Sequence, residues 1–124
     1  MRLRLVDYQY TRKMRLRGQA DFDRVHESSV YAADQTLVVR ASCNECANLR
    51  LGVSISRKVG NAVIRNRWKR LVREAFRLER DHLPKSMDLV VRPRRGAVPD
   101  ASEIRHSLRR LVERVARQLS EAER

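Results

Sequence analysis

The side chains between residues 57 and 73 have the chemistry to bind phosphate groups. Seven basic residues lie in this segment, and no acidic residue accompanies them: Arg57, Lys58, Arg65, Arg67, Lys69, Arg70 and Arg73. An arginine guanidinium can grip two phosphate oxygens at once. Asn66 adds an amide that can donate to a phosphate or to a ribose 2′-hydroxyl. The segment therefore predicts a surface that binds a folded nucleic acid.

The charge of the whole chain favours the same interpretation. There are 28 Lys and Arg against 15 Asp and Glu, a formal net charge of +13, and the pI is about 11.2. Such a surface attracts polyanions, either a nucleic acid or an anionic membrane. A membrane-binding helix needs its apolar side free to enter lipid, but here that side carries Trp68 and Phe76, which a small sheet needs for cover. We therefore favour nucleic acid, with RNA slightly ahead of DNA because of Asn66.

No catalytic site within the chain is indicated. Metal-dependent nucleases gather several carboxylates around the ions. The acidic residues of this sequence are mostly flanked by arginine and form no such cluster, among them Asp21, Asp23, Glu74, Glu79, Asp81 and Asp88. No glycine-rich phosphate loop is present, and no serine or cysteine nucleophile has an evident base partner. The pattern predicts a binding protein that has no catalytic residues and holds no cofactor by itself.

Cys43 and Cys46 form one C-x-x-C pair. A structural zinc ion needs four ligands, and the histidines His26, His82 and His106 are too scattered to complete such a set. Redox pairs of this spacing normally lie where a strand meets a helix, whereas SCNECANLR is typical of a polar loop. We interpret the two cysteines as incidental loop residues and expect no metal site.

A helix from about Gly60 to Arg80 must carry the basic side chains. Its apolar residues recur at helical spacing and form one stripe: Ile64, Trp68, Leu71, Val72, Ala75 and Phe76. At about 100° per residue, the opposite side presents Lys69, Arg70, Arg73, Arg77 and Arg80, with Arg65 and Arg67 at its edges. This helix is predicted to pack on a core through one side and to present cations on the other.

Residues 36–42 and 50–56 have the pattern of strands. In the second segment apolar residues alternate with small ones, so that one face should be buried. If the two strands form a hairpin, the other face carries Val38, Arg40 and Ser54. That face either accepts a ligand or is simply solvated, and alternation alone does not decide between the two.

The remaining segments complete one α+β domain. QADFDRVHE is typical of a short helix over residues 19–27, and MDLVVRP of a strand over residues 87–93. Asp100 and Glu103 have the spacing of a capping box ahead of a long apolar stripe, which predicts a last helix. The segment up to about Arg17 is compatible with a short strand or a basic arm, and we favour a mobile arm. The domain is assigned to residues 14–124, with residues 1–13 as an arm or an upstream extension.

The run LGVSISRKVGNAVIRNRWKRLVREAF resembles the signature of the bacterial ribonuclease P protein family. In that signature an R-N-R motif opens a basic helix after a strand and a K-x-G-N-A-V turn. The motif here is Arg65, Asn66 and Arg67. ADFDRV, MDLVVRPRRGA and residues 104–115 are similar to other parts of the family, so that the resemblance spans residues 14–118.

The resemblance implies a two-layer α/β sandwich with a central mixed sheet of about four strands and a left-handed βαβ crossover. It also implies an endoribonuclease that works as a ribonucleoprotein. In such a particle the catalytic RNA subunit performs the hydrolysis with magnesium, while the protein binds that RNA and the 5′ leader of precursor tRNA. No obligate protein partner is evident.

The resemblance assigns residues of this chain to two surfaces. Binding of the catalytic RNA falls to Arg57, Lys58, Asn61, Arg65, Asn66, Arg67, Lys69, Arg70 and Arg73. A cleft between the first helix and the sheet holds the leader and is lined by Phe22, His26, Val38, Arg40 and Ser54. Two positions depart from the family pattern. A second aromatic is common where His26 stands, and an aromatic or apolar residue is common where Arg40 stands.

The sequence leaves other functions open. A ribosomal or general RNA-structuring protein would be indifferent to a 5′ leader. A protein-only nuclease or a C-x-x-C redox enzyme would need a catalytic group that the pattern does not reveal. No apolar run approaches the roughly 18 residues that span a bilayer, and the start of the chain lacks the apolar centre of a secretory signal. We therefore expect no membrane partner and a cytoplasmic location.

Overall fold

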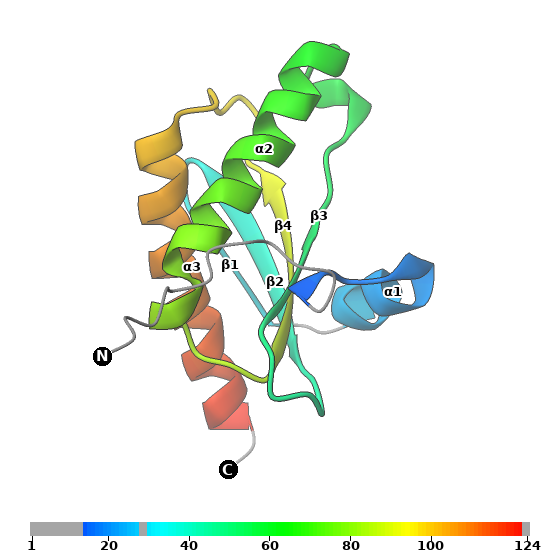
Figure 1. Ribbon diagram of the computed structural model, residues 1–124, viewed down its shortest axis with the longest axis vertical. Helices are drawn as coiled ribbons and strands as arrows, with labels where there is room; N and C mark the ends of the chain where they lie inside the picture. Colours follow the sequence, from blue (N-terminus) through cyan, green and yellow to red (C-terminus); the bar gives the residue numbers. More distant parts are fainter. Residues whose placement is uncertain (1–13, 28–29, 123–124) are drawn as a thin grey trace, which may run out of the picture.

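The computed structural model describes residues 14–27 and 30–122. Its elements are α1 (Gly18–Glu27), β1 (Tyr31–Ala33), β2 (Leu37–Cys43), β3 (Arg50–Val53), the 3-10 turn η2 (Arg57–Val59), α2 (Ala62–Glu79), the 3-10 turn η3 (Arg80–His82), β4 (Met87–Pro93) and α3 (Ala101–Ala122). The helices surround one central sheet (Figure 1). The α+β class is confirmed, and the short strand β1 is an addition to the predicted elements.

The strands of the sheet lie in the order β1-β2-β4-β3. β2 pairs antiparallel with both β1 and β4, whereas β3 runs parallel to β4. β4 therefore separates β2 from β3, and the hairpin that alternation suggested is wrong. Alternation within each strand could not reveal this arrangement, because the strand that enters between them comes much later in the chain, after α2.

The connection from β3 through α2 to β4 has the uncommon left hand. In Figure 1 both strands run upward, β4 lies to the left of β3, and α2 descends in front of them. Right-handed crossovers are the strong default in parallel βαβ units. Only the family resemblance could predict this feature.

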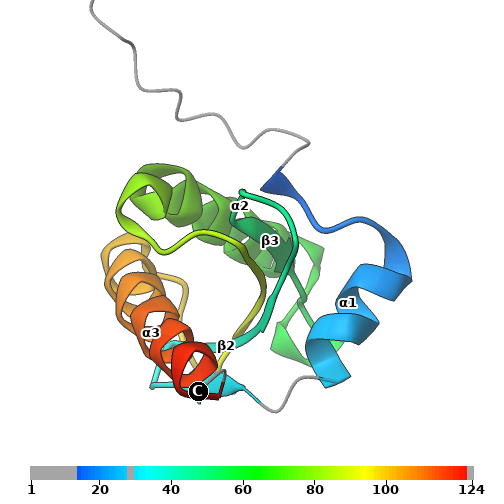
Figure 2. The same cartoon turned by 90° about the horizontal axis from the view of Figure 1, so that it is seen from below.

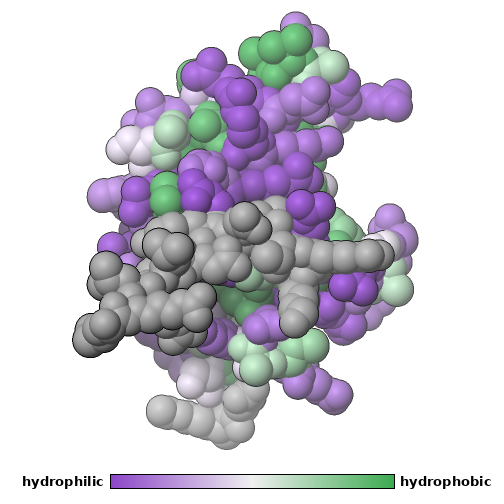
Figure 3. Space-filling view, in the orientation of Figure 1, coloured by the Kyte–Doolittle hydropathy of each residue, from purple (hydrophilic) through white to green (hydrophobic). Residues whose placement is uncertain are grey.

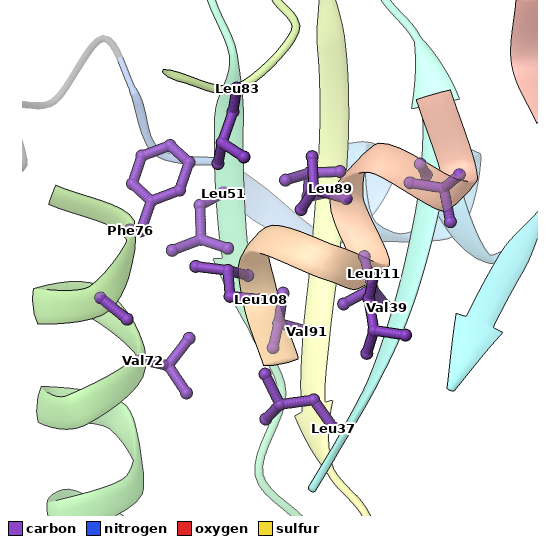
Figure 4. Packing of buried hydrophobic residues seen from close by; sticks show 14 of the residues in the cluster. Leu37, Val39, Leu51, Val72, Phe76, Leu83, Leu89, Val91, Leu108 and Leu111 are labelled. Atoms are coloured by element: carbon purple, nitrogen blue, oxygen red, sulfur yellow. The ribbon is translucent and has the colours of Figure 1, made fainter. Parts of the chain in front are cut away.

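One face of the sheet shares a core with α2 and α3 (Figure 4). The fully buried side chains of this core include Leu37, Val39, Leu51, Leu89 and Val91 from the sheet, Trp68, Val72 and Phe76 from α2, and Ile104, Leu108 and Leu111 from α3. Burial of each large apolar side chain stabilises the fold by about 1.5–3 kcal/mol. Ile64, assigned to the same stripe from the sequence, is instead 36% exposed; it lies in the first turn of α2, beside Gly60.

Helix α1 lies on the opposite side of the sheet from α2 and α3 (Figure 2). Val25 and Leu16 are buried against Val90, and the ring of Phe22 packs on the same cluster. Gly52 permits this close approach, because a Cβ atom at that position would lie 2.6 Å from Cζ of Phe22. α1 therefore covers part of the face that the core leaves open.

Residues 14–17 are docked on the sheet and do not belong to a mobile arm. The amide of Leu16 donates to the carbonyl of Leu51 over 3.1 Å, and Arg15 forms a parallel bridge with Leu51. The prediction of an arm as far as Arg17 is wrong for these residues, because their alternation reflects pairing with the edge of β3. Residues 1–13, predicted as an arm or extension, lie outside the described residues.

Asp34 ties the turn between β1 and β2 to α3. Its carboxylate accepts hydrogen bonds from the amides of Thr36 (2.8 Å) and Leu37 (3.0 Å), from Oγ of Ser107 (2.7 Å) and from Nη2 of Arg110 (2.7 Å). Burial by itself raises the pKa of Asp34, but these donors together outweigh it and lower the pKa to about 2. The folded state therefore favours the ionised carboxylate.

Acid should weaken the fold through Asp34. A carboxyl group with a lower pKa in the folded chain stabilises the fold above its ordinary pKa of 3.8, and this contribution is lost as the pH falls toward about 2. We expect Asp34→Asn to lower the free energy of unfolding near pH 7 by about 2 kcal/mol. Urea unfolding should also show a shallower loss of stability between about pH 4 and pH 2.

The control is Glu113→Gln, which removes an exposed pair with Arg109 at 3.9 Å. It should change stability by less than about 1 kcal/mol. A loss of stability in acid that is as steep in Asp34→Asn as in the unmodified chain would contradict this role of Asp34.

Candidate nucleic-acid interface

The outer side of α2 is cationic. Arg67 and Arg70 are exposed, and Arg65 and Lys69, one helical turn apart, are partly buried along one edge of this side. Within residues 14–27 and 30–122, no carboxylate forms an ion pair with any of these four. The surface over this part of α2 is mainly hydrophilic (Figure 3). The protein's own carboxylates therefore leave this charge uncompensated in the described part of the chain.

A hollow follows the outer side of α2. The residues that line it are Arg15, Asn66, Lys69, Arg70, Arg73, Glu74 and Arg77. Its one carboxylate, Glu74, pairs with Arg77, and the hydrogen bond from Arg77 lowers the pKa of Glu74. The hollow therefore has an excess of positive charge. Sequence reasoning missed Arg15, because it assigned that residue to a mobile arm.

The first turn of α2 adds further donors. Asn61 caps the helix, since its Oδ1 accepts a hydrogen bond from the amide of Ile64 over 3.0 Å. Arg57 and Lys58 are exposed in η2, just before this cap. Nε of Arg65 is buried and has no hydrogen-bond partner among the described residues. A helix N-terminus carries a partial positive charge, so that all these groups favour an anionic ligand.

The predicted RNA-binding residues thus form two groups along one helix. Asn66, Lys69, Arg70 and Arg73 surround the hollow. Arg57, Lys58, Asn61, Arg65 and Arg67 lie around the start of α2. Their role in binding RNA stays a prediction from the motif. What the structure adds is that all nine lie on or beside one element, with only Asn61 also serving as a helix cap.

The predicted leader-binding residues belong to the opposite side of the sheet, on and beside α1. Val38 and Arg40 alternate to this side on β2, Ser54 follows β3, and Phe22 and His26 come from α1. Their accessibility differs. Val38 is only 3% exposed, whereas His26 is exposed and Arg40 and Phe22 are half-buried. Val38 therefore lies beneath its neighbours and offers almost no surface of its own.

Two residues on this side were missed from the sequence. Tyr31 lies opposite Arg40 in the β1–β2 register, and Arg92 lies opposite Val38 in the β2–β4 register. Both are exposed. Tyr31 was not predicted from the sequence, because a strand of three residues is too short to show alternation. Arg92 was not predicted to face this side, because MDLVVRP has the pattern of a continuous buried strand.

A buried ionic network holds α1 against this side of the sheet. Asp88 is fully buried on β4. It accepts two hydrogen bonds from Arg50 and one from Asn44, each of 2.7 Å, and another from Arg24 of α1 at 2.5 Å. Burial by itself raises the pKa of Asp88, but these donors, led by Arg50, outweigh it and lower the pKa. Arg24 and Arg50 also pair with Asp21, at 3.2 and 3.7 Å.

The network gives the acidic residues a structural role. Asp21 and Asp88 are near one another only through arginines that neutralise both. Over residues 14–27 and 30–122 no group of three or more His, Cys, Asp or Glu side chains could hold a metal ion.

Cys43 ends β2 and Cys46 follows in the loop, and both thiols are exposed and unbonded to each other. None of the helices described is long and apolar enough to cross a membrane.

Comparison with known proteins identifies the family. The sequence profile described as Ribonuclease P matches residues 10–116. A ribonuclease P protein component from Staphylococcus aureus is 39% identical over 85 residues, which cover 67% of this chain and 72% of that protein. This chain belongs to the ribonuclease P protein family. The family resemblance of the R-N-R motif is thereby confirmed.

Solved structures of ribonuclease P proteins share the fold. The protein from Staphylococcus aureus has 35% identity and a TM-score of 0.71, over 81% of this chain and 93% of that chain. The protein from Thermotoga maritima has 35% identity and a TM-score of 0.73, over 81% of this chain and 96% of that chain. In this member of the ribonuclease P family, the motif Arg65, Asn66 and Arg67 occupies the first turns of α2, next to the cationic hollow.

Replacing Arg67 should change how RNA binding depends on salt. Each phosphate contact releases counterions, so that loss of one contact lowers the slope of log K against log salt by about one. We expect Arg67→Ala to weaken binding to ribonuclease P RNA and to flatten this slope by that amount, as measured by filter binding over a range of salt concentrations. A slope equal to that of the unmodified chain would exclude Arg67 from the contacts.

Arg109→Ala is the matched control. Arg109 is as cationic as Arg67, but it lies on α3 and pairs with Glu113. Its removal should leave the slope unchanged.

Proposed function

We propose that this chain is the protein subunit of ribonuclease P. It binds the catalytic RNA through the cationic side of α2, and it holds the 5′ leader of precursor tRNA on the sheet face beside α1. The RNA subunit performs the hydrolysis with magnesium, and this chain supplies no catalytic residue and no metal site of its own. The cleavage removes the leader and makes the mature 5′ end of the tRNA, in the cytoplasm.

The observation that carries this proposal is that Arg65, Arg67, Lys69 and Arg70 of α2 form no ion pair with any carboxylate in the described part of the chain. Like charges one turn apart on a helix cost a few tenths of a kcal/mol per pair, and no ion pair among the described residues offsets this cost for Arg67 and Arg70. A folded RNA offers phosphates at high density, and each contact releases counterions. The position of the R-N-R motif at the start of this helix supports RNA of ribonuclease P as the polyanion.

The opposite side of the sheet suits a single strand. Single-stranded nucleic acid is held by aromatic side chains that stack on bases and by cations that contact the backbone. Phe22 and Arg40 supply both kinds of group within the predicted cleft, and Arg92 adds another cation. The two RNA-binding surfaces then lie on opposite sides of one sheet, so that one protein can contact both the catalytic RNA and its substrate.

Reconstitution tests the role of subunit. Purified protein with magnesium should leave precursor tRNA intact, because no catalytic group is assigned to the chain, and adding ribonuclease P RNA should produce cleavage at the mature 5′ end. Gel analysis of end-labelled precursor measures both. Cleavage by the protein alone would overturn the proposal. Cys43→Ser combined with Cys46→Ser is the control variant and should retain the activity of the holoenzyme.

Phe22→Ala tests the leader surface. Stacking on an aromatic is worth about 1–3 kcal/mol per base, so that the holoenzyme should lose about fivefold or more of its preference for precursor over mature tRNA. The affinity of the protein for the catalytic RNA should be unchanged, because Phe22 lies on the other side of the sheet from α2. A general RNA-structuring protein, the alternative function, would show no preference for the leader in the first place.

A further inference from the structure

We propose that Tyr31 and Arg40 form a binding site for one unpaired nucleotide at the β1 edge of the sheet. The nucleotide's base stacks on the face of the Tyr31 ring that points away from Arg40, and its phosphate contacts the guanidinium of Arg40. The inference rests on the proposed function, because the nucleotide belongs to the 5′ leader. It adds a second aromatic contact, on a different element from Phe22.

The geometry of the pair is already suited to this task. Tyr31 and Arg40 are direct partners in the β1–β2 register, and Cζ of Arg40 lies over the ring of Tyr31, 5.3 Å from its centroid. This distance is within the roughly 6 Å of a cation–π contact. The contact holds both planar groups in a defined orientation, so that binding costs little additional side-chain ordering.

The exposure of Tyr31 is unusual for an aromatic side chain of this protein. Among the aromatic residues that the structure describes, Trp68 and Phe76 are fully buried in the core and Phe22 is half-buried. Tyr31 is 53% exposed. Its neighbour Ala32 points the other way, into the core, so that the ring of Tyr31 contributes nothing to that core. A ligand gives this exposed ring a physical role.

The surroundings of the pair suit a single strand of RNA. Arg92 lies opposite Val38 in the β2–β4 register. Val38 is two residues from Arg40 on β2, so that Arg92 and Arg40 lie on the same side of the sheet. Val38 is nearly covered, whereas Tyr31, Arg40 and Arg92 are the accessible aromatic and cationic groups among the described residues of this part of the sheet. Bases in a duplex are already stacked on both faces, whereas unpaired bases are open to aromatic side chains. The site therefore recognises an unpaired nucleotide of any base type, because every base has a π face.

The register places Tyr31 and Phe22 at opposite ends of one row across the sheet. Tyr31 is opposite Arg40, Arg40 is opposite Val90, and Val90 is opposite Gly52. Phe22 packs directly over Gly52. Three strand spacings separate the ends of this row, a distance of about 14 Å. One base cannot stack on both rings over that distance, so that Tyr31 and Phe22 bind different nucleotides of the leader.

The experiment measures binding of precursor tRNA to the reconstituted holoenzyme, with calcium in place of magnesium to slow cleavage. Tyr31→Ala should weaken binding of leader-bearing precursor by about fivefold or more and leave mature tRNA unaffected. Tyr31→Phe keeps the ring and the contact with Arg40, so that it should bind as the unmodified chain does. Val98→Ala is the matched control, because it truncates another exposed apolar side chain, 74% exposed, outside the sheet.

Leaders with a single abasic nucleotide then locate the contact. The penalty of Tyr31→Ala should vanish when the abasic nucleotide is at one particular position of the leader. The penalty of Phe22→Ala should vanish at a different position. A penalty for Tyr31→Ala that persists with every abasic leader would assign Tyr31 a role in packing and overturn the inference.

The remaining outcomes separate this inference from the proposed function. If the unmodified holoenzyme prefers precursor over mature tRNA and Tyr31→Ala keeps that preference in full, the nucleotide site at Tyr31 is wrong and the leader surface stands. If the unmodified holoenzyme shows no preference, the leader surface itself is wrong, and the site at Tyr31 is overturned with it.

Discussion

The two-sidedness of α2 is the constraint on which the rest of this structure depends. Trp68, Val72 and Phe76 are fully buried between the sheet and α3, and each contributes about 1.5–3 kcal/mol through burial. Repulsion between the cations of the outer side costs only a few tenths of a kcal/mol per pair. Packing therefore outweighs repulsion, and the helix can present Arg67 and Arg70 without an acidic partner among the described residues. The same burial makes the helix a rigid support for the side chains of the R-N-R motif.

The sheet, like α2, has two sides with different roles: one side belongs to the core, and the other faces α1. Alternate residues of β2 and β4 enter the core shared with α2 and α3, and the residues between them face the side of α1. On that side, Asp88 draws Arg50, Asn44 and Arg24 together and so fixes α1 next to β3 and β4. Gly52 lets Phe22 approach the strand closely. The buried carboxylate of Asp88 is neutralised here by Arg50 and Arg24, whereas Arg67 and Arg70 of α2 are exposed.

Residues 14–17 extend the cationic surface of α2 by docking on β3. Leu16 pairs with β3 and is buried, and this pairing carries Arg15 to the hollow along α2. Arg15 thus adds to the same cationic surface as the helix. A segment that looked independent of the domain in the sequence thus lines the hollow along α2.

The sequence by itself determined the features that depend on neighbours along the chain. The period of the apolar residues predicted α2 and its two sides, Asp100 and Glu103 predicted the cap of α3, and the R-N-R motif indicated the family. These features are local, because a helix is set by residues three or four positions apart and by its cap. Tertiary structure decided which strands pair, that β4 enters between β2 and β3, and that residues 14–17 dock. It also decided that Tyr31 meets Arg40, because contacts between distant segments depend on burial and register across the whole sheet, and no single stretch of sequence contains them.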